Sequence, residues 1–148
     1  MPLLPFGSAP ASKKVFVPYT GATADVDLGA HNIKAANLVG QIQFVLPAVA
    51  GSQARVRIPK DLTITSAIIV GDVSGSAVVD IWKDTYANYP PTDADSITAA
   101  TPPTLSSAIK NTDSTLTGWT KSFTAGDWLI ANVDSCSTLN ELVIVLTY

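Results

Sequence analysis

The amino-acid sequence predicts an all-β protein, an antiparallel β-sandwich of jelly-roll type. From residue 53 onward, short runs rich in Thr, Ile and Val alternate with turns that contain Gly or Pro, and no segment has the spacing of an amphipathic helix. Charged residues are 14% of the 148 residues, against roughly 25% in typical domains. Ser, Thr, Asn and Gly must therefore cover the surface, as is common in extracellular and virion proteins of the all-β class.

Residues 1–18 are predicted to form an extended arm that anchors the protein to a larger particle. Three prolines among the first ten residues prevent a helix and favour a polyproline-like conformation. The arm has no core of its own, so we expect its apolar side chains to dock on another surface; a disordered tail is the alternative. These side chains are Leu3, Leu4 and Phe6.

Residues 19–52 are predicted to be a connector, because glycines interrupt their short apolar bursts, and residues 53–148 to be the sandwich module. Strands are expected at residues 55–58, 63–70, 77–83, 117–123, 127–133 and 141–147. The sequence GDVSGS predicts a hairpin turn between the second and third of these strands. One helical turn is expected near residues 105–110.

Two of the expected strands are apolar on both faces, which predicts a second buried layer. In the run LVIVLT, Val143 and Val145 oppose the leucines and the isoleucine, and Trp128 and Ile130 oppose other apolar residues in the same way. We expect these four side chains to form a subunit interface in a homotrimer. The alternative is that loops of the same chain cover them.

The sequence lacks the residue patterns of an enzyme or a metal site. His31 is the only histidine and Cys136 the only cysteine, while Glu141 is the only glutamate and begins a predicted strand. Asp93 and Asp95 lack the glycine and the closing glutamate of a calcium loop. We therefore expect no catalytic residue, no metal and no cofactor.

The net charge and the hydropathy of the sequence limit the classes of partner that we expect. The net charge is −3 and the basic residues are scattered, which argues against binding of nucleic acid. No run reaches the roughly 18 apolar residues of a membrane span, so we expect no membrane insertion. The first residues lack the basic and apolar regions of a signal peptide.

A proline-ended loop after the expected strand at 77–83 is the candidate ligand-binding site. Its sequence, KDTYANYPP, contains Tyr86 and Tyr89, whose flat rings are suited to stacking on sugar rings. Asp84 and Asn88 supply hydrogen-bonding groups that a sugar would need. The alternative is that the two tyrosines only stiffen the loop.

Two segments resemble proteins of tailed bacteriophages. VPYTGATADVDLGAHNIKAANL, residues 17–38, resembles a segment of tail-fibre and related virion proteins, and PYTGAT and DVDLG are its most specific elements. The run GDVSGSAVVDIWKDTYANYPP, with PPTLSS, TAGD and NVDS, is similar to a β-rich module at the ends of phage fibres. The resemblance covers most of the chain from Val17 onward. It implies a homotrimer in the virion, made in the host cytoplasm, and no catalytic residue.

The function that we expect is that of a short phage fibre. Its N-terminal arm would attach to another virion protein of the capsid or tail, and its β-sandwich would bind a host-surface glycan. Tail fibres are commonly longer than 148 residues, so a capsid decoration protein without a receptor role is the alternative. A hydrolase of surface polysaccharide is a distant third possibility.

Overall fold

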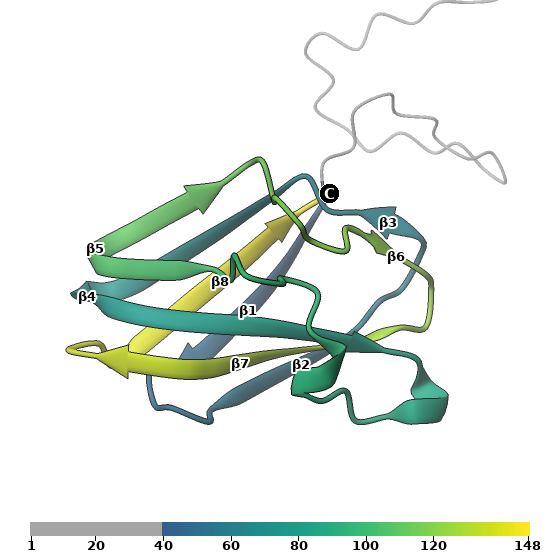
Figure 1. Cartoon of the computed structure of the whole chain (residues 1–148), viewed down its shortest axis with the longest axis horizontal. Helices are drawn as coiled ribbons and strands as arrows, with labels where there is room; N and C mark the ends of the chain where they lie inside the picture. The colour runs from purple at the N-terminus through teal and green to yellow at the C-terminus, as the bar shows by residue number, and fades with distance from the viewer. Residues whose placement is uncertain (1–39) are drawn as a thin grey trace, which may run out of the picture. The chain divides into compact units, whose positions relative to one another are not determined.

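The computed structural model describes residues 40–148 and confirms the all-β prediction (Figure 1). Its elements are β1 (Gln41–Pro47), β2 (Gln53–Arg57), β3 (Leu62–Thr63), β4 (Ser66–Asp84), the 3₁₀ turns η1 (Tyr86–Asn88) and η2 (Asp93–Asp95), β5 (Thr104–Asp113), β6 (Ser122–Phe123), β7 (Trp128–Ser137) and β8 (Glu141–Thr147). The predicted arm with Leu3, Leu4 and Phe6, most of the predicted connector and His31 lie outside the described residues.

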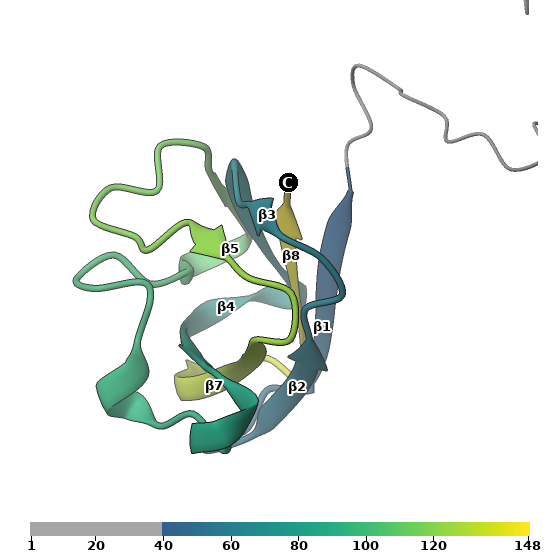
Figure 2. The same ribbon diagram turned by 90° about the vertical axis from the view of Figure 1, so that its right-hand side faces the viewer.

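One antiparallel sheet of six strands forms both layers of the sandwich. Its order is β1-β8-β4-β7-β2, and β5 pairs with β4. The first part of β4 pairs with β8, whereas its second part pairs with β7. The sheet bends along β4 and nearly closes, so that its two halves face each other (Figure 2). A short pair, β3 and β6, lies apart from this path.

The core lies inside the bent sheet, because the inward side chains of each strand alternate with outward ones. In β1 the alternation is strict, and Phe44 is aligned with Ile144 of β8, which in turn is aligned with Ile69 of β4. All three side chains are buried, and each such burial contributes about 1.5–3 kcal/mol. Leu62 and Phe123 of the β3–β6 pair join the same core. The alternation in β1 therefore fixes which face of the sheet is inside.

The predicted hairpin at GDVSGS is wrong, because β4 runs through this sequence as one strand from Ser66 to Asp84. Its register shifts next to Gly75, where a Cβ atom would lie 2.6 Å from the carbonyl oxygen of Ser137. Only glycine allows the two backbones to approach so closely. Gly75 therefore allows β4 to bend and does not form a turn between two strands.

Three other boundaries differ from the prediction. Residues 105–110 form part of β5 and not a helical turn, since their backbone pairs with β4. Only Ser122–Phe123 of the strand expected at 117–123 is a strand. The sheet begins at Gln41, inside the predicted connector, because β1 pairs along its whole length with β8.

The chain enters and leaves the sheet at the same place. The amide of Gly40 donates to the carbonyl oxygen of Tyr148 and the amide of Tyr148 donates to that of Gly40, each at 2.9 Å. The Tyr148 ring lies so close to Gly40 that a side chain at residue 40 would collide with it. Lys60 places its ammonium 5.2 Å from the centre of the same ring.

Candidate functional site

The outer side of β2, β7 and the second part of β4 is the covered face. Cross-strand register aligns Arg57, Trp128 and Asp84 in one row, and Arg55, Ile130 and Trp82 in the next. Ile130 is 1% exposed and Trp82 is 9% exposed although both point away from the main core. The chain after β4 folds back here and pairs Ser96 with Trp82, so residues 85–98, the covering loop, close this face.

Asp80 attaches the covering loop to the sheet. Asp80 is 7% exposed, and its carboxylate accepts hydrogen bonds from the indole N–H of Trp82 at 2.8 Å and from the hydroxyl of Ser96 at 2.8 Å. It also accepts hydrogen bonds from the amide of Ile81 and the hydroxyl of Thr98. A buried carboxylate with this many donors is satisfied, so its role is to hold the loop in place.

The two tyrosines of the predicted site occupy different positions in the covering loop. Tyr89 is 40% exposed, and its ring packs edge-on against Trp128 with 5.0 Å between the ring centres. The indole N–H of Trp128 is buried and has no partner among the described residues. Tyr86 is 75% exposed and stands on η1. Tyr89 therefore holds the loop, whereas Tyr86 is presented to solvent.

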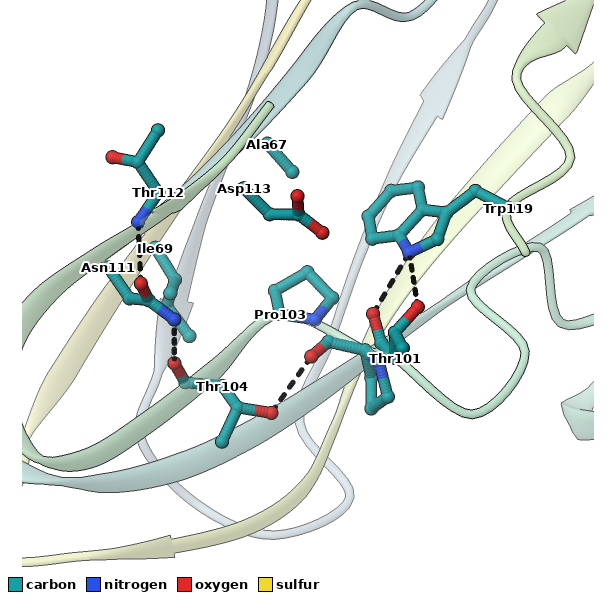
Figure 3. Close-up of a pocket in the computed structure, with 10 residues that line it drawn as sticks. Ala67, Ile69, Thr101, Pro103, Thr104, Asn111, Thr112, Asp113 and Trp119 are labelled. Carbon is teal, nitrogen blue, oxygen red and sulfur yellow. Dashed lines mark hydrogen bonds between the residues drawn. The ribbon is translucent and has the colours of Figure 1, made fainter. Parts of the chain in front are cut away.

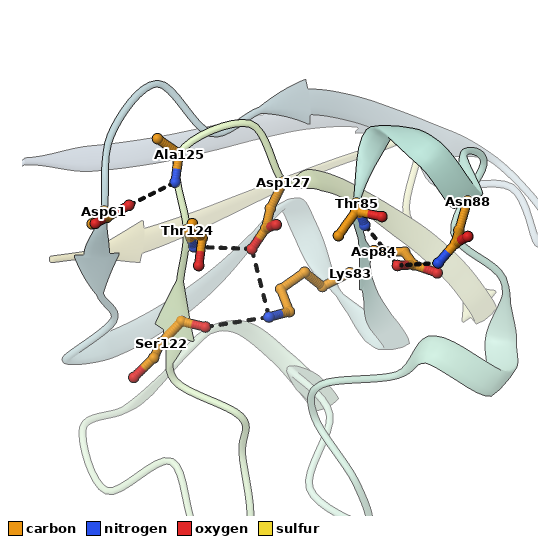
Figure 4. A network of polar contacts seen from close by, with 9 residues as sticks. All are labelled: Asp61, Lys83, Asp84, Thr85, Asn88, Ser122, Thr124, Ala125 and Asp127. Atoms are coloured by element: carbon orange, nitrogen blue, oxygen red, sulfur yellow. Dashed lines mark hydrogen bonds and ion pairs between the residues drawn. The ribbon is translucent and has the colours of Figure 1, made fainter.

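Asp84, at the end of β4, accepts hydrogen bonds from two residues of the covering loop (Figure 4). Asp84 Oδ1 accepts a hydrogen bond from the amide of Thr85 at 2.6 Å and another from the side-chain amide of Asn88 at 3.2 Å. The Thr85 amide, followed by the Asn88 amide, holds the pKa of Asp84 below its usual value. Three of the four predicted ligand-binding residues thus lie in the covering loop, and the fourth, Asp84, is ionised at the end of β4 directly before it.

Lys83 of β4, next to the covering loop, connects this strand to β6 and to the turn before β7. The ammonium of Lys83 lies 3.6 Å from Asp127 Oδ2 and donates to the carbonyl oxygen of Ser122 at 3.4 Å (Figure 4). Asp127 Oδ2 also accepts from the amide of Thr124 at 2.9 Å. Lys83 is thereby engaged within the chain.

The outer side of β1, β8 and the first part of β4 is the open face, and it carries a cluster of apolar side chains bordered by polar ones such as Gln43 and Lys110. Register aligns Val45, Val143 and Val70 in one row, and Val145 lies beside Ile68 in the next. Val45 is 53% exposed, and the other four side chains are half-buried.

The four residues predicted for a subunit interface therefore separate into two groups. Val143 and Val145 lie on the open face, where a second chain could reach them. Trp128 and Ile130 lie under or beside the covering loop. Ile130 is a correction to the prediction, because its side chain is already covered within the chain and offers no surface to a partner.

No family model and no curated protein matches the chain. Within residues 40–148 no three His, Cys, Asp or Glu side chains gather to hold a metal ion, and no helix in that range could cross a membrane. Cys136 is half-buried and its thiol donates to the carbonyl oxygen of Ala48 at 2.8 Å.

Sequence reasoning missed Asp80, which organises the candidate site. The signal was present, since VVDIW places one carboxylate inside an apolar strand. A charge in such a run is retained when it accepts several hydrogen bonds.

Proposed function

We propose that this chain is a structural protein of a bacteriophage particle, a short fibre that displays its β-domain for binding to the host surface. The observation that carries the proposal is Tyr86, a ring 75% exposed to solvent on a loop held in place from several sides. Large exposed rings on ordered loops give contact area at low entropic cost. The protein, as proposed, binds and does not catalyse.

Two further features support the same proposal. Residues 17–38 resemble segments of virion proteins, and an attachment segment before the domain agrees with a fibre. The open face gives a homotrimer a surface on which to form, with Val143 and Val145 in the interface. Three copies would raise weak single-site binding by roughly 10²–10⁴ through effective concentration.

The test uses phage particles that carry the full-length protein. Tyr86→Ala should lower adsorption to host cells about tenfold or more while the copy number on the particle stays normal. Tyr86→Phe, which keeps the ring, is the matched control and should adsorb nearly as the wild type does. Normal adsorption of Tyr86→Ala particles at full occupancy would refute the receptor role.

A capsid decoration protein is the second candidate, and the open face is the observation that favours it. An apolar sheet face can clamp a neighbouring shell subunit as well as a second copy of the chain. Cryo-electron microscopy of the whole particle separates the two functions. Density for the domain lying flat on the capsid, through Val45 and Val143, would support decoration.

A further inference from the structure

A pocket separate from the covering loop lies between β4, β5 and residues 101–104 (Figure 3). Its volume is about 300 Å³, at the small end of the roughly 300–1,000 Å³ of ligand pockets. Ala67 and Ile69 of β4 line it from the core side, and Trp119 closes one wall. Asp113 points toward the Trp119 indole across the pocket.

The apolar walls of this pocket are stiff. The indole N–H of Trp119 donates to the carbonyl oxygen of Thr101 at 2.9 Å and to its hydroxyl at 3.1 Å. The ring is thereby fixed with its polar edge toward Thr101. Pro102 and Pro103 add side chains without rotational freedom. Trp119 is 7% exposed, Pro103 is buried and Pro102 is half-buried, so these walls offer a small apolar contact that costs little entropy on binding.

The strongest polar group in the pocket is an acceptor. Asp113 Oδ1 accepts hydrogen bonds from the amides of Thr115 at 2.8 Å and Leu116 at 3.0 Å. Both backbone bonds end on Oδ1, so Oδ2 keeps its capacity to accept. These amides, with that of Leu116 first, hold the pKa of Asp113 below its usual value, so the group is ionised near neutral pH.

The remaining hydroxyls mostly donate within the chain. Thr104 donates to the carbonyl oxygen of Pro102 at 2.8 Å, and Thr101 donates to that of Thr117 at 2.7 Å. A ligand that fits must therefore bring hydrogen-bond donors to Asp113 and apolar C–H groups to the indole and the prolines.

Charge selects among such ligands. No Lys or Arg lines the pocket, so an anion would meet the carboxylate without compensation. Lys121 lies near enough to favour the charged form of Asp113, and its ammonium is held by the carbonyl oxygen of Thr115 at 2.8 Å. Because the Lys121 ammonium already offsets part of the Asp113 charge, an ionic ligand has less to gain here, which favours a neutral donor over an ammonium.

We propose that this pocket binds one neutral sugar ring, with Asp113 accepting from its hydroxyls and Pro102 and the exposed edge of Trp119 contacting its C–H groups. The site does not depend on Tyr86 or Tyr89, which lie on a different loop. It would give each chain a second point of contact with a polysaccharide.

The test is NMR titration of the isotope-labelled full-length protein with neutral hexoses and N-acetylhexosamines, one at a time. The indole signal of Trp119 should shift with at least one sugar. Asp113→Asn keeps an oxygen for the amides of Thr115 and Leu116 but replaces the free acceptor with a donor. We expect it to weaken binding about tenfold or more.

A second variant tests the site by reducing the volume of the pocket. Ala67→Val places two more carbon atoms in the pocket on a strand that tolerates β-branched residues, and binding should be lost while the remaining spectrum keeps its dispersion. Val49→Ala, at a side chain that is 60% exposed in the turn after β1, is the control and should bind as the wild type does.

Three outcomes would overturn the inference. The first is that no neutral sugar shifts the Trp119 signal. The second is that tetramethylammonium binds more tightly than every sugar. The third is that sugar binding is lost in Tyr86→Ala and kept in both pocket variants, which would refute the pocket and support the proposed role of Tyr86.

Discussion

The two outer faces of this sheet both carry apolar side chains but differ in what surrounds those side chains. On the covered face, Trp82 and Ile130 lie beneath a loop of the same chain that Asp80 holds through side-chain hydrogen bonds. On the open face, short β-branched side chains such as Val45 and Val143 remain partly exposed. The difference shows that a strand with apolar side chains on both faces needs a second layer to cover the outer face. Residues elsewhere in the chain determine whether a loop of the same chain supplies that layer.

The largest expected effect on stability comes from removing Asp80, which holds the covering loop on the sheet. Asp80→Ala leaves the indole N–H of Trp82 and the hydroxyls of Ser96 and Thr98 without their acceptor. Since each unsatisfied buried donor costs about 1–3 kcal/mol, we expect a loss of roughly 3–5 kcal/mol in the free energy of unfolding. Urea denaturation followed by Trp fluorescence measures it.

The matched control for this change is Asp80→Asn, which keeps one acceptor oxygen. It should lose clearly less stability than Asp80→Ala. Equal losses for the two variants would mean that the carboxylate does not hold the loop through these bonds.

A pair of truncations compares the two faces directly. Ile130→Ala removes a side chain that is 1% exposed and should cost about 2–4 kcal/mol at any protein concentration. Val143→Ala on the open face should cost less than about 1 kcal/mol in dilute protein. Its cost should rise with concentration if a second chain covers it. A Val143→Ala cost as large as that of Ile130→Ala in dilute monomer would contradict the distinction.

Charges on the open face should stop association without unfolding the domain. Val45 and Val143 lie opposite each other on β1 and β8, and changing both to Lys places two charges within a proposed trimer interface. Because the side chains point away from the core, the circular dichroism spectrum should not change. Light scattering should report a trimer for the wild type and a monomer for the variant; a monomeric wild type would refute the trimer.

The smallest expected effect concerns the pKa of an acidic side chain on β7. Burial raises the pKa of Asp134 above its usual value of 3.8, and the charges of Asp80 and Asp93 add to the shift, although a bond from Asn132 opposes it. The folded protein therefore binds this proton more tightly than the unfolded chain, so stability falls as pH rises through the raised pKa.

Asp134→Asn removes this dependence while its amide oxygen can still accept from Asn132. The variant should be slightly more stable than the wild type near pH 7 and no more stable near pH 3. Thermal denaturation at both pH values checks the sign. A variant less stable than the wild type near pH 7 would show that the carboxylate is favourable there.

Local pattern was enough to predict the fold class and three of the eight strands that the structure describes. Alternation located β2, β7 and β8 to within a few residues, because a strand that is buried on one face shows a period of two. It failed at β4, where Gly71 and Gly75 have the composition of a turn. The decisive factor there is the close approach of Ser137, which is distant in sequence. It failed again at β1, whose partner lies about a hundred residues later.

The sequence was enough to predict which loop carries the candidate site, but not how the side chains of the loop are arranged. Tyr86 and Tyr89 are close in sequence, and only the packing of Tyr89 on Trp128 distinguishes their roles. The pocket at Trp119 and Asp113 was not predicted, since its walls come from three separate segments. Long-range contacts leave no local signal in a single sequence.

The backbone bonds between Gly40 and Tyr148 mean that the domain is joined to the rest of a polypeptide at a single point. A domain with adjacent ends is portable, because it can be inserted into a surface loop of another protein with little displacement of the loop's own ends. The same closure makes circular permutation feasible, with a short linker joining Tyr148 to Gly40 and new ends in the exposed turn at Ala50 and Gly51. The order of the strands along the chain is thus separable from their arrangement in space.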